Sequence, residues 1–482
     1  MKLLKTIALL IFVQLSFGQN TTKKIDSIIT SLHSNGKFNG SILIADKGKI
    51  TYLKSHGFAD EITKEKLDEN SIFDIASVSK QFTAMGIMIL KEKGILKLDD
   101  KLSKHISLLS SYDNITIKNL LNHTSGLPDY MRVLAPLVDR TKLISNTDII
   151  EMYSKLAQKL KFEPGSKFEY SNTGYVFLAS IIEKVSGNNY AQFLEKEIFK
   201  PLNMSRSFAN ITGSSPQNIQ NYAHGYLYSR QEKKYLKPSQ IERARQMFGW
   251  IAAYGDGGVN STVIDLLKWD RALYTNKLIS KKSIEEMFTP TYNNNTLLKN
   301  YGYGWDIKKN KLTGTFVRHS GGWPGYVTEI ERHIKTDKTI IVLQNHYDTK
   351  RPAKLIRNIL FGKEAPKTIS QLYKDGRRVE NIIEFSQNPE TSFLVNGFKE
   401  RDINGFGYEL LGKGKNKSAL KLFILNTQLY PNSANAFDSL GECYLKFGEK
   451  FKKESVKAYK KALLLNPNNE NAKSILNKLV KL

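Results

Sequence analysis

Ser77 and Lys80 are the two residues whose types and spacing most directly suggest chemistry. They lie three positions apart, just before an apolar run from Gln81 to Leu90 that is typical of a buried helix. Side chains three apart on a helix share one face and can touch. An amine beside a hydroxyl is one way to activate a weak nucleophile. The pair therefore predicts acyl transfer by a serine that has no histidine base.

The same serine–lysine spacing occurs three times in the chain, so spacing alone does not identify a site. The other two copies are Ser34 with Lys37 and Ser418 with Lys421. The first contains a glycine and leads into a strand-like segment, where the two side chains need not meet. The last lies in an expected surface helix, where a solvated lysine is the ordinary interpretation. The surroundings of Ser77 must therefore decide.

Two further motifs offer polar side chains in suitable places. Tyr170-Ser171-Asn172 precedes an apolar helical pattern, so we expect it on a loop entering a helix, where side chains can reach a cleft. His319-Ser320-Gly321 is the only H-x-G in the chain, and we expect it at the end of a strand. Gly322 follows it, and glycines let the backbone approach a ligand closely with an unobstructed N–H.

The three motifs, in this order, resemble the class C-like branch of the serine β-lactamase and D-alanyl-D-alanine carboxypeptidase superfamily. That branch carries S-x-x-K, then Y-x-N, then K-T-G or H-x-G. Two longer blocks strengthen the resemblance, Leu120 to Tyr130 and the Gly-rich Gly257 to Thr262 with the following Asp265-Leu266. The resemblance covers about residues 22–362.

The resemblance implies a role for each site residue. Ser77 would attack a carbonyl and form an acyl-enzyme, with Tyr170 as general base and Lys80 assisting it. Lys80 and Tyr170 would titrate as a coupled pair, and the sequence does not say which of them holds the proton. Asn172 would hydrogen-bond the substrate amide and orient Lys80.

The remaining roles concern the opposite wall and the oxyanion hole. The backbone N–H groups of Ser77 and Gly322 would stabilise the oxyanion. His319, with Ser320 and Gly321, would line the opposite wall, where His319 would hold a substrate carboxylate or the Tyr170 hydroxyl. No cofactor and no metal site are expected, since the sequence shows no cluster of cysteine, histidine and acidic ligands.

The substrate stays open among several classes. A histidine in place of the K-T-G lysine grips a carboxylate less surely, which disfavours a β-lactamase. The activities that stay open are those of a D-amino-acid peptidase or carboxypeptidase and of an esterase, with a β-lactamase as the alternative. The rival from another class is a non-catalytic scaffold of the cell envelope, against which the complete set of motif residues argues. His123 and Ser125 are expected to fix a loop, whereas Trp323 and Tyr326 either line the pocket mouth or pack on the sheet.

Alternating and helical patterns predict an α/β (α+β) fold. It is an antiparallel sheet built from both ends of a 340-residue unit, flanked by helices and carrying a helical subdomain. The expected strands are Ser41–Ala45, Ile50–Leu53, Thr315–His319, Tyr326–Glu331 and Thr339–Leu343. The expected helices include Thr22–Leu32, Asp148–Leu160, Tyr175–Val185 and Pro352–Leu360.

An internal repeat predicts a separate all-α region after this unit. Shifting the segment Asn416–Ala436 by 36 residues aligns it with Lys452–Ala472 and places Phe423 on Tyr459. The pattern resembles tetratricopeptide repeats, with Ala434 to Phe447 as the helix between and further helical pairs over 369–412. Such repeats suggest a protein or peptide partner.

The first residues and the charge set the expected compartment. Two lysines and a short apolar run predict a signal peptide over 1–18. The motifs and the repeat described above then predict a hydrolase domain over 19–362 and the helical domain over 363–482. The protein is thus expected to be periplasmic or secreted from a bacterium, with no integral membrane segment in the mature chain. The net charge of +26 comes from 72 basic against 46 acidic residues, but export argues against a nucleic-acid partner. Cys443 is the only cysteine, so stability must come from core burial without an internal disulfide.

Overall fold

The computed structural model divides into two compact units, Met1–Phe361 and Gly362–Leu482. The structure describes 21–361 apart from short gaps at 140–141, 214–218, 246, 294–295, 311–312, 348 and 350, and in the second unit 367–368, 370, 373, 379–380, 383, 395–396 and 399–480. The signal peptide expected over 1–18 lies outside these residues. No helix among them is long and apolar enough to cross a membrane.

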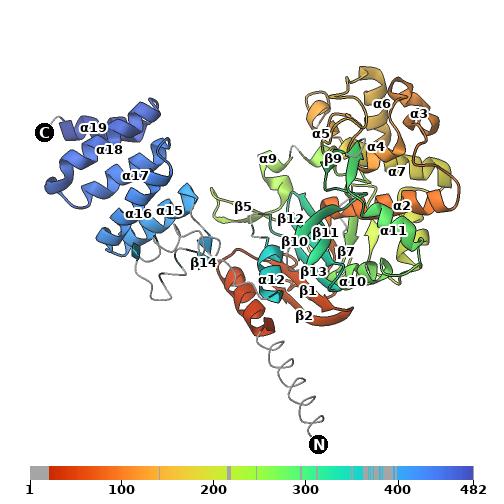
Figure 1. The fold of residues 1–482 in the computed structure, drawn as a ribbon, viewed down its shortest axis with the longest axis horizontal. Helices are drawn as coiled ribbons and strands as arrows, with labels where there is room; N and C mark the ends of the chain where they lie inside the picture. The colour runs from red at the N-terminus through yellow and green to blue at the C-terminus, as the bar shows by residue number, and fades with distance from the viewer. Residues whose placement is uncertain are drawn as a thin grey trace, which may run out of the picture. The chain divides into compact units, whose positions relative to one another are not determined.

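A six-stranded antiparallel sheet organises the first unit, with strand order β10-β11-β12-β13-β1-β2 (Figure 1). Segments from the two ends of this unit meet where β1 pairs with β13, so that Ile42 lies opposite Val342. This confirms the predicted fold class, although edge strand β10 was not predicted. The strands are β1 Gly40–Asp46, β2 Lys49–His56, β10 Asp306–Asn310, β11 Gly314–Trp323, β12 Tyr326–His333 and β13 Lys338–Gln344.

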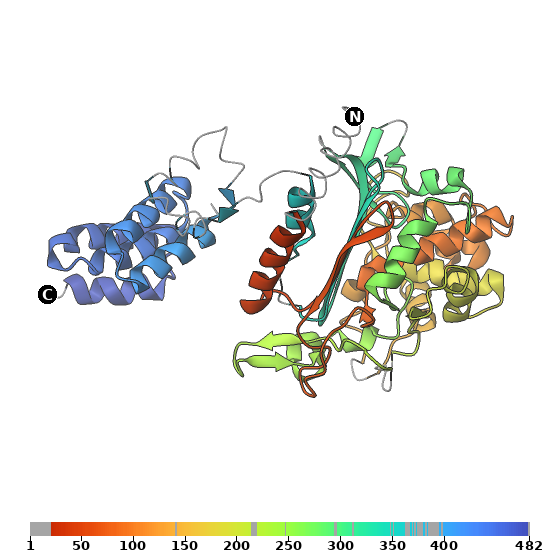
Figure 2. The same cartoon turned by 90° about the horizontal axis from the view of Figure 1, so that it is seen from below.

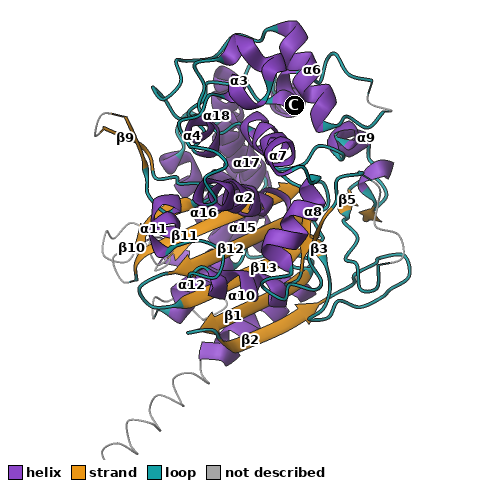
Figure 3. Ribbon diagram, turned by 90° about the vertical axis from the view of Figure 1, so that its right-hand side faces the viewer, coloured by secondary structure: helices purple, strands orange, loops and turns teal. Residues whose placement is uncertain are grey.

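Helices cover both faces of this sheet (Figure 2). The helix over 21–34 and α12 (Ala353–Leu360) lie on one face, whereas α2 (Lys80–Glu92) and α10 (Val263–Ala272) lie on the other. Every residue of α2 from Lys80 to Leu90 is buried, which explains its continuous apolar pattern. The helical subdomain packs beyond α2 (Figure 3) and contains α3 Leu102–His105, α4 Ile117–Leu121, α5 Tyr130–Val133, α6 Asn146–Leu156 and α7 Asn172–Ser186.

Several element boundaries differ from the predicted ones. Helix α6 begins earlier, at the Ser145 capping box, and ends at Ala157, whose φ of 40° is left-handed. Helix α7 begins at Asn172, which places this residue on the helix rather than on the preceding loop. Strand β11 continues to Trp323, so the expectation that His319 ends a strand is wrong. The tight turn between β11 and β12 lies four residues beyond His319, because Trp323 pairs with Tyr326.

A second, three-stranded sheet joins segments that are far apart in the sequence. Its order is β3-β7-β4, with β3 at Phe73–Asp74, β7 at Val259–Ser261 and β4 at Phe208–Ala209. It brings the turn before Ser77 beside the glycine-rich segment before Val259. The other elements of this unit are α8 Tyr190–Leu194, α9 Glu242–Arg245, α11 Lys281–Met287, β5 Leu227–Ser229, β6 Lys234–Leu236, β8 Thr291–Asn293 and β9 Thr296–Lys299.

The second unit consists mainly of successive helices around its own apolar core. One packing contact recurs along it. A Cβ added to Gly407 would lie 2.6 Å from the Phe423 ring, and one added to Gly441 would lie 2.9 Å from the Tyr459 ring. The helices are α15 Glu400–Gly412, α16 Asn416–Leu429, α17 Ala434–Leu445, α18 Lys452–Leu465 and α19 Glu470–Val480, preceded by the two-residue strands β14 Lys367–Thr368 and β15 Val395–Asn396. Much of the 369–412 segment lies outside the described residues.

Candidate active site

Ser77 and Lys80 meet at the junction of a 3-10 turn and α2. The turn spans Ala76–Ser79, and the helix begins at Lys80. The three-residue spacing turns both side chains to the same side, and Lys80 Nζ lies 3.3 Å from Ser77 Oγ. Lys80 is completely buried, whereas Ser77 is partly exposed. The hydroxyl is thus open to a ligand while the amine stays inside.

Lys80 is held by two further acceptors. Its Nζ donates to Asn172 Oδ1 at 2.8 Å and to the backbone carbonyl of Asp256 at 2.7 Å. The amide oxygen and the carbonyl oxygen can only accept, so Nζ donates to both, and its contact with Ser77 Oγ is the one in which either atom can donate. These contacts therefore hold the Lys80 amine beside the Ser77 hydroxyl.

Asp129 fixes the orientation of Asn172, a role that sequence reasoning missed. Its Oδ2 accepts both the backbone N–H and the side-chain Nδ2 of Asn172, each at 2.9 Å. With its amide nitrogen committed to Asp129, Asn172 turns its oxygen toward Lys80. Asp129 lies within the Leu120–Tyr130 block, but nothing in the sequence around this loop carboxylate indicated that it would pair with Asn172.

The turn that carries Ser77 is strained at the preceding residue. Ala76 has a φ of 49°, in the left-handed region that non-glycine residues seldom occupy. The Asp74 carboxylate stabilises the turn because its Oδ1 accepts the Ala76 N–H at 2.7 Å. Alanine gives no sequence signal for this conformation, so the role of Asp74 was also missed.

Tyr170 touches Lys80 through its ring. Lys80 Nζ lies 5.1 Å from the ring centroid, and the His123 ring lies against the Tyr170 ring, tilted by 33° with 4.2 Å between centroids. His123 Nδ1 accepts the Ser171 N–H at 3.3 Å, so it fixes the loop that carries Tyr170. Tyr170 is 38% exposed, and its hydroxyl has no hydrogen-bond partner among the described residues. Proton transfer between Tyr170 and Lys80 stays a prediction.

His319 is buried and neutral. Its Nδ1 donates to the Ser320 carbonyl at 2.9 Å, and its Nε2 accepts from the Tyr301 hydroxyl at 2.9 Å. Burial and, after it, the nearby Lys80 charge lower the pKa of His319 to about 3. With both nitrogens occupied and no charge at neutral pH, His319 offers little to a substrate carboxylate. Its expected substrate contact stays a prediction.

Gly321 lets strand β11 press against the turn of Ser77. A Cβ at this position would lie 2.2 Å from Thr328 Oγ1 and 2.4 Å from the Ile75 carbonyl oxygen. The next residue, Gly322, lines the same pocket as Ser77. Their predicted pairing in an oxyanion hole rests on this close approach and stays a prediction.

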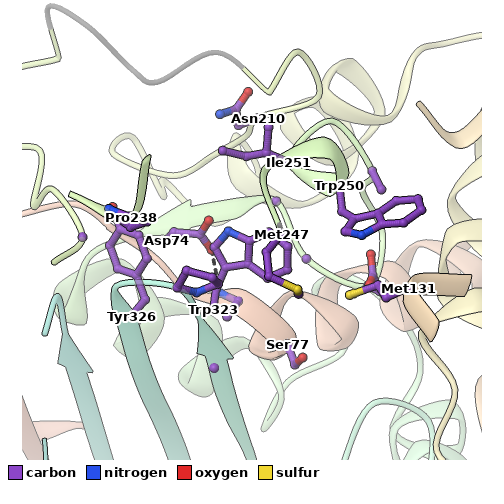
Figure 4. Close-up of a pocket in the computed structure, with 18 of the residues that line it drawn as sticks. Asp74, Ser77, Met131, Asn210, Pro238, Met247, Trp250, Ile251, Trp323 and Tyr326 are labelled. Carbon is purple, nitrogen blue, oxygen red and sulfur yellow. Dashed lines mark hydrogen bonds between the residues drawn. The ribbon is translucent and has the colours of Figure 1, made fainter. Parts of the chain in front are cut away.

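Ser77 lies in a pocket of about 440 Å³ (Figure 4). Large apolar side chains dominate one part of its wall, and two carboxyl groups, Asp74 and Asp256, lie among the polar lining. Trp323 and Tyr326 line it as well, and Trp323 also packs against the apolar core. Burial raises the pKa of each carboxyl to about 6. The apolar lining includes Met131, Met247, Trp250, Ile251 and Trp323.

The sheet, the helical subdomain and the serine–lysine pocket define a serine hydrolase of the β-lactamase and penicillin-binding protein superfamily. The chain belongs to the beta-lactamase family, whose model, described as Beta-lactamase, matches residues 25–362. The C-terminal helical unit lies outside that match.

Relatives support this assignment. Penicillin-binding protein 4* of Bacillus subtilis (strain 168) is 41% identical over 349 residues, which cover 72% of this chain and 77% of that protein. The putative penicillin-binding protein PbpX of the same strain is 28% identical over 360 residues, or 71% of this chain and 82% of that protein.

Two solved structures share the fold. The octameric penicillin-binding protein homologue from Pyrococcus abyssi has a TM-score of 0.62 at 28% identity, covering 76% of this chain and 82% of that chain. The D-amino acid amidase from Ochrobactrum anthropi SV3, solved with L-phenylalanine amide, has a TM-score of 0.59 at 25% identity, covering 71% of this chain and 96% of that chain.

Proposed function

We propose that the protein is an exported hydrolase that cleaves an amide or ester through an acyl-enzyme on Ser77, of the D-amino-acid peptidase, carboxypeptidase or esterase type. One observation carries the proposal: a completely buried Lys80 amine, held by Asn172 and Asp256, lies 3.3 Å from a pocket-facing hydroxyl. A positioned base beside a nucleophile is the arrangement that acyl transfer needs.

The proton pathway follows from the contacts of this site. Ser77 Oγ would lose its proton to the Lys80–Tyr170 pair as it attacks, and the same pair would return it to the leaving group. The backbone N–H groups of Ser77 and Gly322 would stabilise the oxyanion, each worth about 3–4 kcal/mol in the transition state. Water would then release the acyl group from Ser77.

A β-lactamase is the second candidate, supported by the family and by penicillin-binding relatives. The state of His319 weighs against it. A β-lactam carries a carboxylate, and a neutral His319 with both nitrogens occupied supplies no positive charge to bind one. A peptidase or esterase places no such demand on this residue.

The C-terminal helices suggest an accessory role. We propose that they form tetratricopeptide-like repeats that bind a protein or peptide, because the glycine–aromatic contact recurs at Gly407 and Gly441. A binding surface of this kind would bring the hydrolase unit to its target.

One experiment tests the proposed hydrolase function. The purified protein is treated with a fluorophosphonate probe and with labelled penicillin, beside Ser77→Ala, and turnover of p-nitrophenyl esters is followed. We expect a Ser77-dependent fluorophosphonate adduct and ester hydrolysis. Slow release of penicillin would favour a peptidase, and rapid turnover would favour a β-lactamase. A protein that gives no Ser77-dependent adduct and no ester turnover would support the non-catalytic scaffold instead.

A further inference from the structure

Asp74 has two carboxyl oxygens, and in the part of the chain that the structure describes only Oδ1 forms a hydrogen bond. Oδ1 accepts the Ala76 N–H at 2.7 Å. Among the described residues, no lysine, arginine or histidine forms an ion pair with Asp74, and the side chain lines the pocket that contains Ser77. A carboxylate facing a partly apolar pocket without a counter-charge is costly unless a ligand supplies that charge.

The second carboxyl group of the pocket adds to this shortage of positive charge. Asp256 lies 5% exposed in the same wall, and its charge raises the pKa of Asp74. Lys80 is hydrogen-bonded to the Asp256 backbone carbonyl and its charge acts on the Asp256 carboxyl, whereas the charge that acts on Asp74 is that of Asp256. The potential in this part of the pocket therefore favours a cation.

Lys237 is the basic residue that also lines this pocket, so its position matters. Its charge acts on His224, whose pKa is lowered first by burial and then by Lys237. Burial, the Ala76 hydrogen bond and the Asp256 charge determine the pKa of Asp74, and no ion pair joins Lys237 to it among the described residues. Lys237 thus leaves Asp74 available to a ligand.

The rest of the wall indicates what accompanies the cation. Figure 4 shows Asp74 near Pro238 and Tyr326, with Trp250 and Met131 on the other side of the pocket. Trp250, which is 3% exposed, and Met131 contribute apolar surface to this part of the wall, against which an apolar group can pack.

We propose that the substrate of Ser77 carries a positively charged amine that pairs with Asp74 and a bulky apolar group that packs against Trp250. This inference rests on the proposed hydrolase function and names its substrate class: amides or esters of hydrophobic amino acids, or of peptides with a free amine. A β-lactam with only a carboxylate does not match this wall. Asp74 then has two tasks, holding the Ala76 turn with Oδ1 and binding the ammonium with Oδ2.

Asp74→Asn separates these two tasks. The asparagine keeps an oxygen that can accept the Ala76 N–H, but it removes the charge. The substrates are p-nitrophenyl esters of phenylalanine, in both the D and L forms, and of 3-phenylpropanoic acid, which lacks the amine. Rates are taken at pH 7.5 with Ser77→Ala as the background.

We expect Asp74→Asn to lower kcat/KM for a phenylalanine ester by about 10- to 100-fold, as loss of a charge-assisted contact would. The kcat/KM for the 3-phenylpropanoic ester should change by less than about threefold, because the variant keeps the hydrogen bond that holds the turn. Equal losses on both substrates would mean that Asp74 only holds the turn, and no loss on either would mean that it does not contact substrate. Both results would overturn the proposal.

A binding measurement keeps the proposal testable without turnover. Calorimetric titration of Ser77→Ala with 2-phenylethylamine and with neutral 2-phenylethanol compares ligands that differ in charge. We expect tighter binding of the amine, and loss of that difference in Ser77→Ala/Asp74→Asn. Equal affinities in Ser77→Ala would overturn the ammonium site, whereas absent Ser77-dependent hydrolysis with a charge-selective site would overturn only the proposed catalytic function.

Discussion

The nucleophile's surroundings are built from hydrogen bonds that each fix one orientation. Asp129 turns the Asn172 amide, the amide oxygen receives Lys80, and Lys80 reaches Ser77. A network of linked hydrogen bonds of this kind restricts its members to one arrangement. The serine–lysine spacing in the sequence predicted only the last of these contacts. The others depend on Asp129, which is 43 residues away from Asn172, and on a backbone carbonyl.

At the scale of one residue, the lowered pKa of His319 predicts how the free energy of unfolding depends on pH. Its pKa is lowered to about 3 in the folded state, from the usual value near 6.5. Between these two pH values the unfolded chain binds a proton that the folded protein does not. The free energy of unfolding therefore falls as the pH falls below 6.5, by up to about 1.4 kcal/mol per pH unit from this residue.

His319→Gln should reduce that loss, because glutamine does not titrate. We expect the hydrolase unit of the variant to lose about 2 kcal/mol less stability than the wild type between pH 7.5 and pH 5. Thermal unfolding at the two pH values measures the difference. His123, whose pKa burial also lowers, leaves a residual pH dependence in both proteins. Identical losses in wild type and variant would show that His319 is not held neutral.

At the scale of elements, strand β11 and the 3-10 turn of Ser77 form one contact. Gly321 is the point of closest approach, since a Cβ there would overlap Thr328 Oγ1 and the Ile75 carbonyl. The neighbouring Gly322 faces away from this contact, and the closest atom to its added Cβ is Arg351 Nη2 at 3.6 Å. Two adjacent glycines thus differ in what a methyl group would meet.

Gly321→Ala and Gly322→Ala are therefore a matched pair. We expect Gly321→Ala to move the strand from the turn, destabilise the hydrolase unit by about 1–3 kcal/mol and lower kcat for a p-nitrophenyl ester by about 100-fold, a barrier increase near 2.7 kcal/mol. Gly322→Ala keeps its backbone N–H and should stay within about threefold of the wild-type kcat. Ester kinetics and thermal unfolding of both variants check this. Similar kcat values for the two would contradict the close approach at Gly321.

How far the sequence predicted these elements depended on the range of the interactions. The strands of the main sheet were predicted because alternating β-branched runs determine them locally, and the sheet's closure followed from their positions. The edge strand β10, rich in lysine and asparagine, lacks that pattern and exists through its pairing with β11. The small sheet that places Asp74 consists of strands two or three residues long, too short for any periodicity to show.

At the scale of the whole molecule, the chain combines a family domain with a helical unit that the family match does not reach. The repeat in the sequence predicts a separate helical domain over 363–482, because each repeat would bury its own apolar face on its neighbour. Phe423 and Tyr459, which the 36-residue shift aligned, do make equivalent contacts with Gly407 and Gly441. The sequence could not predict the glycines' role, since a glycine within a helix usually indicates only weakness.

Gly441 and Gly405 test whether the helical unit is stabilised by such close packing and is independent of catalysis. A Cβ at Gly441 would meet the Tyr459 ring at 2.9 Å, whereas one at Gly405 has nothing within 4 Å. Gly441→Ala should destabilise the helical unit by about 1–3 kcal/mol through overpacking. Gly405→Ala should stabilise it by about 1 kcal/mol through helix propensity.

Circular dichroism melts follow the unit's unfolding, and p-nitrophenyl ester kinetics follow Ser77. Because the hydrolase unit has its own core, both variants should keep the wild-type kcat/KM. A fall in kcat/KM that parallels the stability loss would show that the two units do not act independently.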